Sequence, residues 1–270
     1  MDLSEILTFK TSRRKDAEQL LNKLLRLIIA LLFLILAADL IFHYLIAPKL
    51  RIRNIIVNSD IPLSRQEVLT IAGIDGKEDY FSLKGDVIGN NLEACPLVRE
   101  ARVEKVFPDT LRLHLRGRKA LFISLADTGQ GSFPVAIDEE GVIFQSGSSI
   151  KEWDLPLISG LKFNELEPGA TLPKMLDSFL AEVTQMRAAY PDIFRLISEI
   201  QIIPLSPASF ELLLYPLSFT VRVRLAGSID GTVLKNALLV LDLLQREGIS
   251  EKVKEIDFRT GEVVYRIKEG

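Results

Sequence analysis

Residues 27–46 read LIIALLFLILAADLIFHYLI, a nearly continuous apolar stretch close to the N-terminus. At ~1.5 Å of rise per residue, about 20 helical residues span the ~30 Å hydrocarbon core of a bilayer. A cleaved signal peptide is the alternative, but its apolar region is usually about 7–15 residues long and ends at a cleavage site with small residues. Here the stretch is longer and continues past Ala37 and Ala38. It therefore predicts one uncleaved transmembrane helix over residues 27–46, after a short tail over residues 1–26.

The basic residues around this stretch predict its orientation. Those before the stretch outnumber those after it, and an excess of Lys and Arg usually stays on the cytoplasmic side. We therefore expect residues 1–26 to be a cytoplasmic tail and the bulk of the chain to lie outside the cytoplasm. The basic residues before the stretch are Lys10, Arg13, Arg14, Lys15, Lys23 and Arg26, and those after it are Lys49, Arg51 and Arg53.

Two polar residues interrupt the apolar stretch. Asp39 would cost about 2.5–3.5 kcal/mol at the centre of a bilayer. His43 lies one helical turn further on and on the same face, so the two side chains can share a hydrogen bond. The pair is either drawn toward the outer interface or in contact with the transmembrane helix of another protein. Asp39 and His43 are therefore a candidate site for a contact inside the membrane.

Composition and motifs argue against several classes of function. The net charge of −3 is nearly balanced and the basic residues are scattered, which is not the pattern of a nucleic-acid-binding protein. Cys95 is the only cysteine, so the chain can form no internal disulfide. No Gly-rich phosphate loop, His-x-x-x-His pair or Cys-x-x-Cys pair occurs. We therefore expect no cofactor, no metal and no small-molecule substrate.

The region after the apolar stretch predicts a compact β-α-α-β-β module. Ser64 and Glu67 have the spacing of a capping box, and Gly73 suits the end of the helix that follows. The predicted elements are a strand over residues 51–57, helices over residues 64–73 and 84–94, and strands over residues 98–106 and 111–116.

The remainder predicts a mostly antiparallel β domain with two helices, so the fold class is α+β. Val221, Val223 and Leu225 alternate with Arg222 and Arg224, which is the period of a half-buried strand. The predicted strands cover residues 133–137, 142–145, 197–203, 210–215, 220–225, 256–259 and 262–267, and the predicted helices cover residues 174–190 and 230–247.

The few candidate catalytic residues are poorly placed for catalysis. His114 lies on the polar face of an alternating strand, and Cys95 has no activating base near it in the sequence. Asp138, Glu139 and Glu140 could supply the two carboxylates of a glycan hydrolase, which lie about 5–9.5 Å apart. Adjacent acids at a hairpin tip are instead expected to point in different directions into water. The sequence therefore predicts a protein without catalytic activity.

Several short motifs occur in the order found in one family. Residues 96–103 read PLVREARV, and residues 107–111 read FPDTL. These stretches resemble the polypeptide-transport-associated (POTRA) module of the bacterial division proteins FtsQ and DivIB, whose pattern is P-x-V-x-x-A-x-V followed by an aromatic residue and P-x-T-L. Residues 138–144, 155–160 and 256–259 resemble the D-x-x-G-x-x-F, L-P-x-L-x-G and I-D-L-R motifs of the same family.

The chain departs from the family pattern at two places. Residues 117–120 read GRKA where the family usually has E-R-x-P after the third strand of the module. Asn58 and Ser59 stand where a glycine commonly follows the first strand. These departures weaken the prediction of the joint between the two domains and of the first turn.

The resemblance implies a POTRA domain over residues 50–119 and an FtsQ/DivIB-type β domain over residues 120–270. It implies a non-catalytic, single-pass protein of the bacterial cell (inner) membrane at the division septum, which links early division proteins to the septal peptidoglycan synthesis complex. The implied partners are FtsB or DivIC and FtsL, bound through the C-terminal edge strand. The implied partner-binding residues are Glu262, Val263, Val264, Tyr265 and Arg266.

Physical chemistry points to the same strand. A C-terminal hairpin leaves an edge whose N–H and C=O groups can accept a strand from another chain. The alternative is an ordinary edge protected by the charged residues that flank it. Two other functions stay open: a POTRA-type accessory protein for envelope assembly or secretion, and a membrane-tethered cell wall hydrolase with Asp138 and Glu140 as its acid pair.

Overall fold

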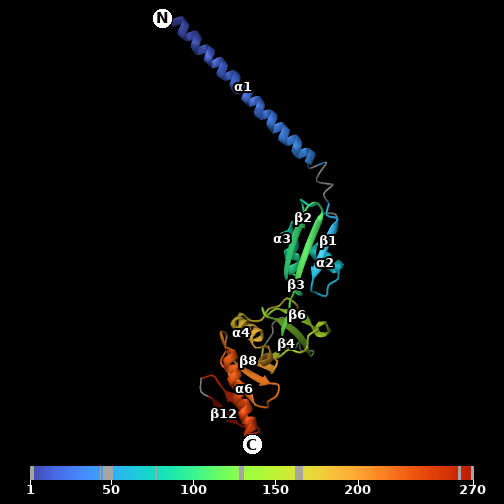
Figure 1. Ribbon diagram of the computed structural model, residues 1–270, viewed down its shortest axis with the longest axis vertical. Coiled ribbons are helices and arrows are strands. Elements are labelled where there is room, and N and C mark those ends of the chain that lie inside the picture. Colours follow the sequence, from blue (N-terminus) through green and yellow to red (C-terminus); the bar gives the residue numbers. More distant parts are fainter. Residues whose placement is uncertain are drawn as a thin grey trace. The chain divides into compact units, whose positions relative to one another are not determined.

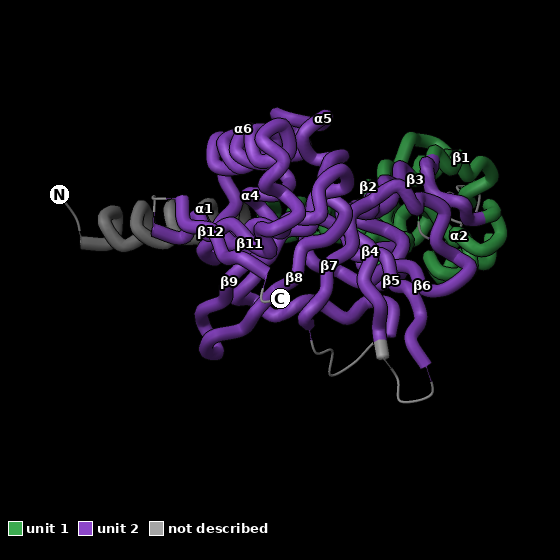
Figure 2. The backbone as a smooth tube through the Cα atoms, turned by 90° about the horizontal axis from the view of Figure 1, so that it is seen from below, with its two compact units in different colours: residues 1–58, 64–89, 102–113 green, residues 59–63, 90–101, 114–270 purple. Residues whose placement is uncertain are grey.

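The computed structural model (Figure 1) describes residues 3–42, 44, 51–76, 78–127, 131–161, 167–260 and 263–268, with the backbone alone for residues 3–21 and 127. The chain divides into two compact units (Figure 2). Unit 1 comprises residues 1–58, 64–89 and 102–113, and unit 2 comprises residues 59–63, 90–101 and 114–270.

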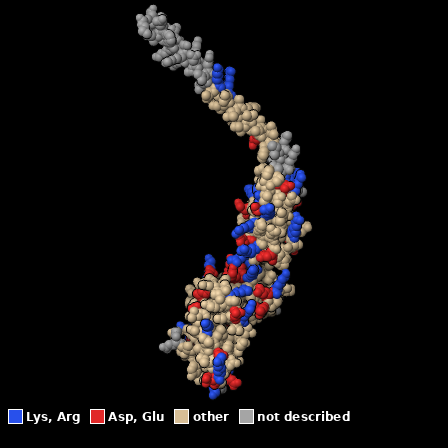
Figure 3. Space-filling model, viewed as in Figure 1, with Lys and Arg blue, Asp and Glu red and all other residues tan. Residues whose placement is uncertain are grey.

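The described chain begins with a long helix, α1 (Leu3–Ile41). Its part from Asn22 to Ile41 has a mean hydropathy of 2.7, and none of it is buried inside the structure. Figure 3 shows basic side chains at the start of this part, an acidic one near its end, and only uncharged ones between them. Because so much exposed apolar surface is unfavourable in water, the helix fits a transmembrane segment, as the sequence predicts. His43 and residues 45–46, at the end of the predicted span, lie outside the described residues.

A small three-stranded sheet follows, in the order β1-β3-β2, together with two short helices. The strands are β1 (Asn54–Ser59), β2 (Val98–Val106) and β3 (Thr110–Gly117), and the helices are α2 (Arg65–Ala72) and α3 (Gly85–Glu93). The order β-α-α-β-β is the predicted one. In β3, Leu111 and Leu113 are buried while His114 is exposed, which confirms the predicted alternation.

The limits of α2 follow from its caps, as the sequence predicts. The hydroxyl of Ser64 accepts the N–H of Glu67 at 3.3 Å, and the carboxylate of Glu67 accepts the N–H of Ser64 at 2.7 Å. This capping box satisfies two N–H groups that have no partner within the helix. Gly73 adopts the left-handed conformation with φ of 71° and ends the helix.

Unit 2 contains a large nine-stranded sheet in the order β12-β11-β10-β9-β8-β7-β4-β5-β6. Its strands are β4 (Ala120–Asp127), β5 (Ser132–Asp138), β6 (Ile143–Ser146), β7 (Leu157–Ser159), β8 (Ile197–Ser206), β9 (Ser209–Pro216), β10 (Arg222–Leu225), β11 (Val253–Asp257) and β12 (Val264–Ile267). Most neighbours are antiparallel, but β10–β11, β4–β7 and β7–β8 are parallel. The fold is α+β, as predicted.

The sequence does not predict two of these strands, β4 and β7. Most of the β4 residues are buried on both faces of the sheet, Ser124 among them, so the strand lacks the alternation that reveals a half-buried strand. β7 has only three residues and pairs in parallel on both sides, with β4 and β8. Parallel neighbours come from distant parts of the chain, so no short turn motif in the sequence indicates that they pair.

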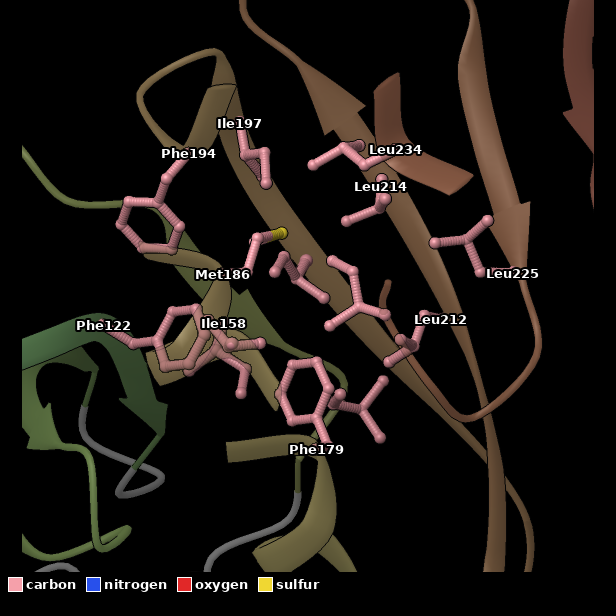
Figure 4. Close-up of a cluster of buried hydrophobic side chains, with 14 of the residues drawn as sticks. Phe122, Ile158, Phe179, Met186, Phe194, Ile197, Leu212, Leu214, Leu225 and Leu234 are labelled. Carbon is pink, nitrogen blue, oxygen red and sulfur yellow. The ribbon is translucent and has the colours of Figure 1, made fainter. Parts of the chain in front are cut away.

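Helices pack against the large sheet and complete its main core (Figure 4). Phe179 of α4 stacks on Phe122 of β4 with the ring centroids 6.1 Å apart, and Leu234 of α6 belongs to the same core. The two long helices lie where the sequence predicts them. The described helical elements after β6 are α4 (Asp177–Ala189), α5 (Pro191–Phe194), α6 (Gly231–Arg246) and the short 3₁₀ turns η3 (Gly147–Ser149) and η4 (Lys174–Leu176).

Gly160, directly after β7, is required by its surroundings. Its φ is 79°, and a Cβ atom there would lie 2.0 Å from the carbonyl oxygen of Ile202 in β8. Both the left-handed backbone and this close approach need a residue without a side chain. The glycine that closes the L-P-x-L-x-G motif therefore allows β7 to pass close to β8.

Gly160→Ala is expected to lower the free energy of unfolding by about 3 kcal/mol or more, because backbone strain and a steric clash add. Gly147→Ala is the matched control. Gly147 also has a positive φ, of 56°, but open space around it, so its replacement should cost only about 1–2 kcal/mol. Denaturant unfolding of the detergent-solubilised full chain, followed by circular dichroism, measures both. Equal losses for the two variants would contradict the close approach.

Candidate partner-binding edge

β12 is the terminal strand of the large sheet. It pairs with β11 on one side, and no described strand lies on its other side (Figure 1). All four of its residues are exposed; Val264, Tyr265 and Ile267 are 53%, 58% and 62% exposed. The edge therefore combines backbone groups that have no neighbouring strand with apolar side chains in water, which favours the addition of a strand.

The register of β12 determines which side of the sheet each side chain faces. Tyr265 lies opposite Ile256, and Arg266 lies opposite Glu255. Opposite residues of an antiparallel pair share one face of the sheet. Tyr265 is therefore on the side of the main core, to which the buried Ile256 belongs, and Arg266 is on the other side.

One hydrogen bond indicates which N–H groups of β12 face a partner. The N–H of Lys268 donates toward the β11 side, to a carbonyl oxygen 2.9 Å away. N–H directions alternate along an antiparallel strand. The N–H groups of Val264 and Arg266 therefore point at β11. Those of Tyr265 and Ile267 point outward, where another chain can reach them.

Charged side chains on β9, β10 and β11, and on one residue after β11, form an ion network beside this edge. The carboxylate of Glu255, only 1% exposed, accepts the Nε–H groups of Arg222 at 2.9 Å and Arg224 at 2.5 Å. Arg259, from the motif at residues 256–259, pairs with the carboxylates of Glu211 and Asp257. The members of the ion network are Glu211, Arg222, Arg224, Glu255, Asp257 and Arg259.

The arginines lower the pKa values of the carboxylates in the ion network. Burial alone would raise the pKa of Glu255, but hydrogen bonds and charge from Arg224 and Arg222 outweigh it. The pKa of Asp257 is lowered chiefly by its hydrogen bond with Arg259. The network therefore stays charged at neutral pH. It fastens β11, the strand that presents β12, to β10 and β9.

Not every predicted site residue can be placed. Glu262, the first residue of the predicted binding segment, and His43 lie outside the described residues. Asp39 is exposed on α1. The contact inside the membrane that Asp39 and His43 could make therefore stays a prediction.

The acidic turn between β5 and β6 differs from the prediction. Asp138 does not point into water, because it is only 1% exposed. Its carboxylate accepts the N–H groups of Glu140 at 3.0 Å and Val142 at 2.8 Å. Its other oxygen lies 2.5 Å from a guanidinium nitrogen of Arg118. The sequence did not indicate this pairing, because Arg118 and Asp138 are 20 residues apart in the chain.

Arginines also hold the other two acids of this turn. Arg118 contacts Glu140 at 2.6 Å, and Arg99 pairs with Glu139. The hydrogen bond from Arg118 lowers the pKa of Glu140. All three carboxylates are thus engaged in ion pairs that tie β2 and the residue after β3 to this turn. Such an arrangement suits a structural role better than acid–base chemistry on a glycan.

The remaining residues considered for catalysis occupy ordinary structural positions. His114 is exposed on β3, and Cys95 is a half-buried free thiol shortly after α3. Among the residues that the structure describes, no group of three or more His, Cys, Asp or Glu side chains is placed to hold a metal ion.

Comparisons with known proteins agree on one family. Residues 50–118 match the family model described as the FtsQ-type POTRA domain. The cell division protein FtsQ of Bradyrhizobium diazoefficiens is 30% identical over 110 residues, which cover 41% of this chain and 31% of that protein. The cell division protein DivIB of Clostridium botulinum strain Hall is 26% identical over 145 residues, 53% of this chain and 55% of that protein.

A third relative extends the match. The cell division protein DivIB of Brevibacillus brevis is 24% identical over 163 residues, which cover 60% of this chain and 61% of that protein. The chain therefore spans less than two thirds of the length of these relatives.

Glu255→Gln is expected to lower the free energy of unfolding at pH 7 by about 2–3 kcal/mol, because two arginines lose their shared counter-charge. The folded pKa of Glu255 lies below its ordinary value of 4.5. Its ionic contribution is therefore present above that pH and is lost as the pH falls through the folded pKa. The wild-type chain should lose stability on acidification more steeply than the variant.

Denaturant unfolding between pH 7 and pH 3 measures this difference. Glu251→Gln, at an exposed turn, is the control and should follow the wild-type curve. If Glu255→Gln and the wild type lose stability in parallel on acidification, the ion network does not depend on the charge of Glu255.

Proposed function

We propose that the chain is a membrane-anchored, non-catalytic scaffold of the bacterial divisome, since residues 50–118 match the FtsQ-type POTRA domain and its relatives are the cell division proteins FtsQ and DivIB. It links early division proteins to the septal peptidoglycan synthesis complex. Its partners are FtsB- or DivIC-like and FtsL-like proteins. The comparisons support the family, and the exposed terminal strand β12 supports the mode of binding.

The proposed layout places the chain across the cell membrane once. Residues 1–26 are the cytoplasmic tail, and residues 27–46 span the membrane. The POTRA domain (residues 50–119) and the β domain (residues 120–270) lie outside the cytoplasm at the division septum. The unburied apolar helix supports the anchor, and the excess of basic residues before it supports the orientation.

The proposed binding mechanism is the addition of a partner strand to β12, within residues 262–266. The observation that carries it is that β12 has one neighbouring strand among the described residues, while all of its side chains are exposed. Outward N–H groups at Tyr265 and Ile267 supply backbone hydrogen bonds, and the alternating side chains supply selectivity. Val263 and Tyr265 offer an apolar surface on one side, and Val264 and Arg266 line the other.

The absence of catalysis is part of the proposal. A glycan hydrolase needs one carboxylic acid and one carboxylate that face the substrate. The best candidates, Asp138 and Glu140, are both bound to Arg118, and Asp138 is buried. These contacts support a structural role for the acidic turn.

Tyr265→Pro is expected to weaken partner capture by at least about tenfold, because it removes an outward N–H and places a ring where the partner strand must pair. Tyr265→Ala is the matched control: it removes the same side chain but keeps the N–H, so its effect should be smaller. Co-purification of the full-length chain with its FtsB- or DivIC-like partner in detergent measures both.

Val264→Pro separates binding from folding. The N–H of Val264 points at β11, so its loss should destabilise the β11–β12 hairpin itself and lower the unfolding temperature. Tyr265→Pro should lower that temperature less. Equal capture by Tyr265→Pro and Tyr265→Ala, with both proteins folded, would show that the partner does not bind by strand addition.

A further inference from the structure

The residues that lead into β1 form backbone hydrogen bonds with two other segments of unit 1. The N–H of Ile52 donates to the carbonyl oxygen of Glu78 at 3.0 Å, and the N–H of Arg53 donates to that of Asp109 at 2.9 Å. The start of β1, the segment before α3 and the turn between β2 and β3 therefore lie together. We call this region, residues 51–54, 78–81 and 105–109, the anchor-side end.

Aromatic rings gather at the anchor-side end. Tyr80 contacts Phe81 and Phe107 edge to face, at centroid distances of 5.4 and 5.8 Å. Phe81 is 51% exposed and Phe107 is 65% exposed. Large apolar side chains exposed next to one another mark a surface that contacts something apolar more often than an ordinary solvated surface.

Hydrogen bonds link the two segments that carry these rings. The amino group of Lys105 donates to the carbonyl oxygens of Tyr80 and Leu83 at 2.8 and 2.9 Å, and it lies 5.0 Å from the centroid of the Tyr80 ring. The hydroxyl of Tyr80 in turn donates to the carbonyl oxygen of Lys105 at 3.3 Å. The exposed phenylalanines are therefore carried by a hydrogen-bonded frame.

The apolar environment nearest to these exposed rings is the bilayer proposed to surround α1. Phe42, directly after α1, lies edge to face with Phe81 at a centroid distance of 5.4 Å. Even a fully extended chain from Phe42 to Arg51 reaches only about 30 Å. Membrane interfaces favour aromatic side chains. Arg51 and Arg53 are exposed at the same end, where they can meet lipid phosphate groups.

We propose that Phe81 and Phe107 dock the anchor-side end on the lipid interface of the bilayer that α1 spans. The proposal rests on the membrane anchor of the proposed function, and it is independent of the partner-binding edge. Docking gives the three-stranded sheet and its helices a second contact with the membrane, in addition to the covalent link to α1.

Tryptophan fluorescence in lipid vesicles tests the docking. The full chain carries Trp153→Phe, which removes its only tryptophan, together with Phe107→Trp as the reporter. It is reconstituted without partners into phosphatidylcholine vesicles whose acyl chains are brominated near the headgroup, so that a tryptophan in contact with them is quenched. The matched control carries Gln66→Trp. Gln66 is exposed in the first turn of α2, beyond the far end of β1, which is about 17 Å long.

We expect strong quenching of the reporter at position 107 and little quenching at position 66. Adding Phe81→Ser to the first variant should reduce the quenching. Equally weak quenching at both positions, in protein that resists carbonate extraction, would overturn the docking and leave the anchor intact. Carbonate extraction of the wild-type chain would overturn the anchor and the docking together. Quenching at position 107 that appears only after a partner protein is added would also overturn the proposal, since the contact would then depend on that protein.

Discussion

Because β12 forms hydrogen bonds with β11 on one side only, the large sheet ends in a strand whose outward N–H and C=O groups have no strand to pair with in the described chain. Such an edge is a liability, and proteins usually protect it with charge, proline or a covering element. Here Tyr265 and Ile267 remain more than half exposed. The proposed function depends on this constraint, because a partner strand would satisfy both the backbone groups and the apolar side chains.

An edge strand can bind a partner strand only if its neighbouring strand in the sheet is held in place. The ion network does this for β11 by placing the buried carboxylate of Glu255 between two arginines of β10. The same arrangement recurs at the acidic turn, where Arg118 faces the buried Asp138. In both places the loss of one partner would leave an uncompensated charge, which costs more than the intact pair contributes. Both clusters therefore act to hold geometry.

Local signals in the sequence were enough to predict much of the fold. The capping box of Ser64 and Glu67, the glycine at position 73 and the alternation in β3 each act within a few residues, so they can be seen without a structure. Features that depend on distant parts of the chain could not be predicted. β7 exists only because β4 and β8 flank it, and Arg118 meets Asp138 across 20 positions of sequence.

The candidate partner-binding edge could be predicted only in part. Its place at the end of the chain and its alternating side chains were predicted from the sequence. The direction of each N–H could not be, because it depends on the register of β12 against β11. That register identifies Tyr265 and Ile267 as the outward donors, and Val264 as a residue that holds the hairpin together.

Residue-resolved hydrogen exchange of the full chain, with and without the proposed FtsB- or DivIC-like partner, is the most direct test of strand addition at β12. The amides of Tyr265 and Ile267 should exchange fast in the chain alone and become protected when the partner binds. The amides of Val264 and Arg266 should be slower than these from the start. Partner binding without added protection at Tyr265 and Ile267 would contradict strand addition at β12.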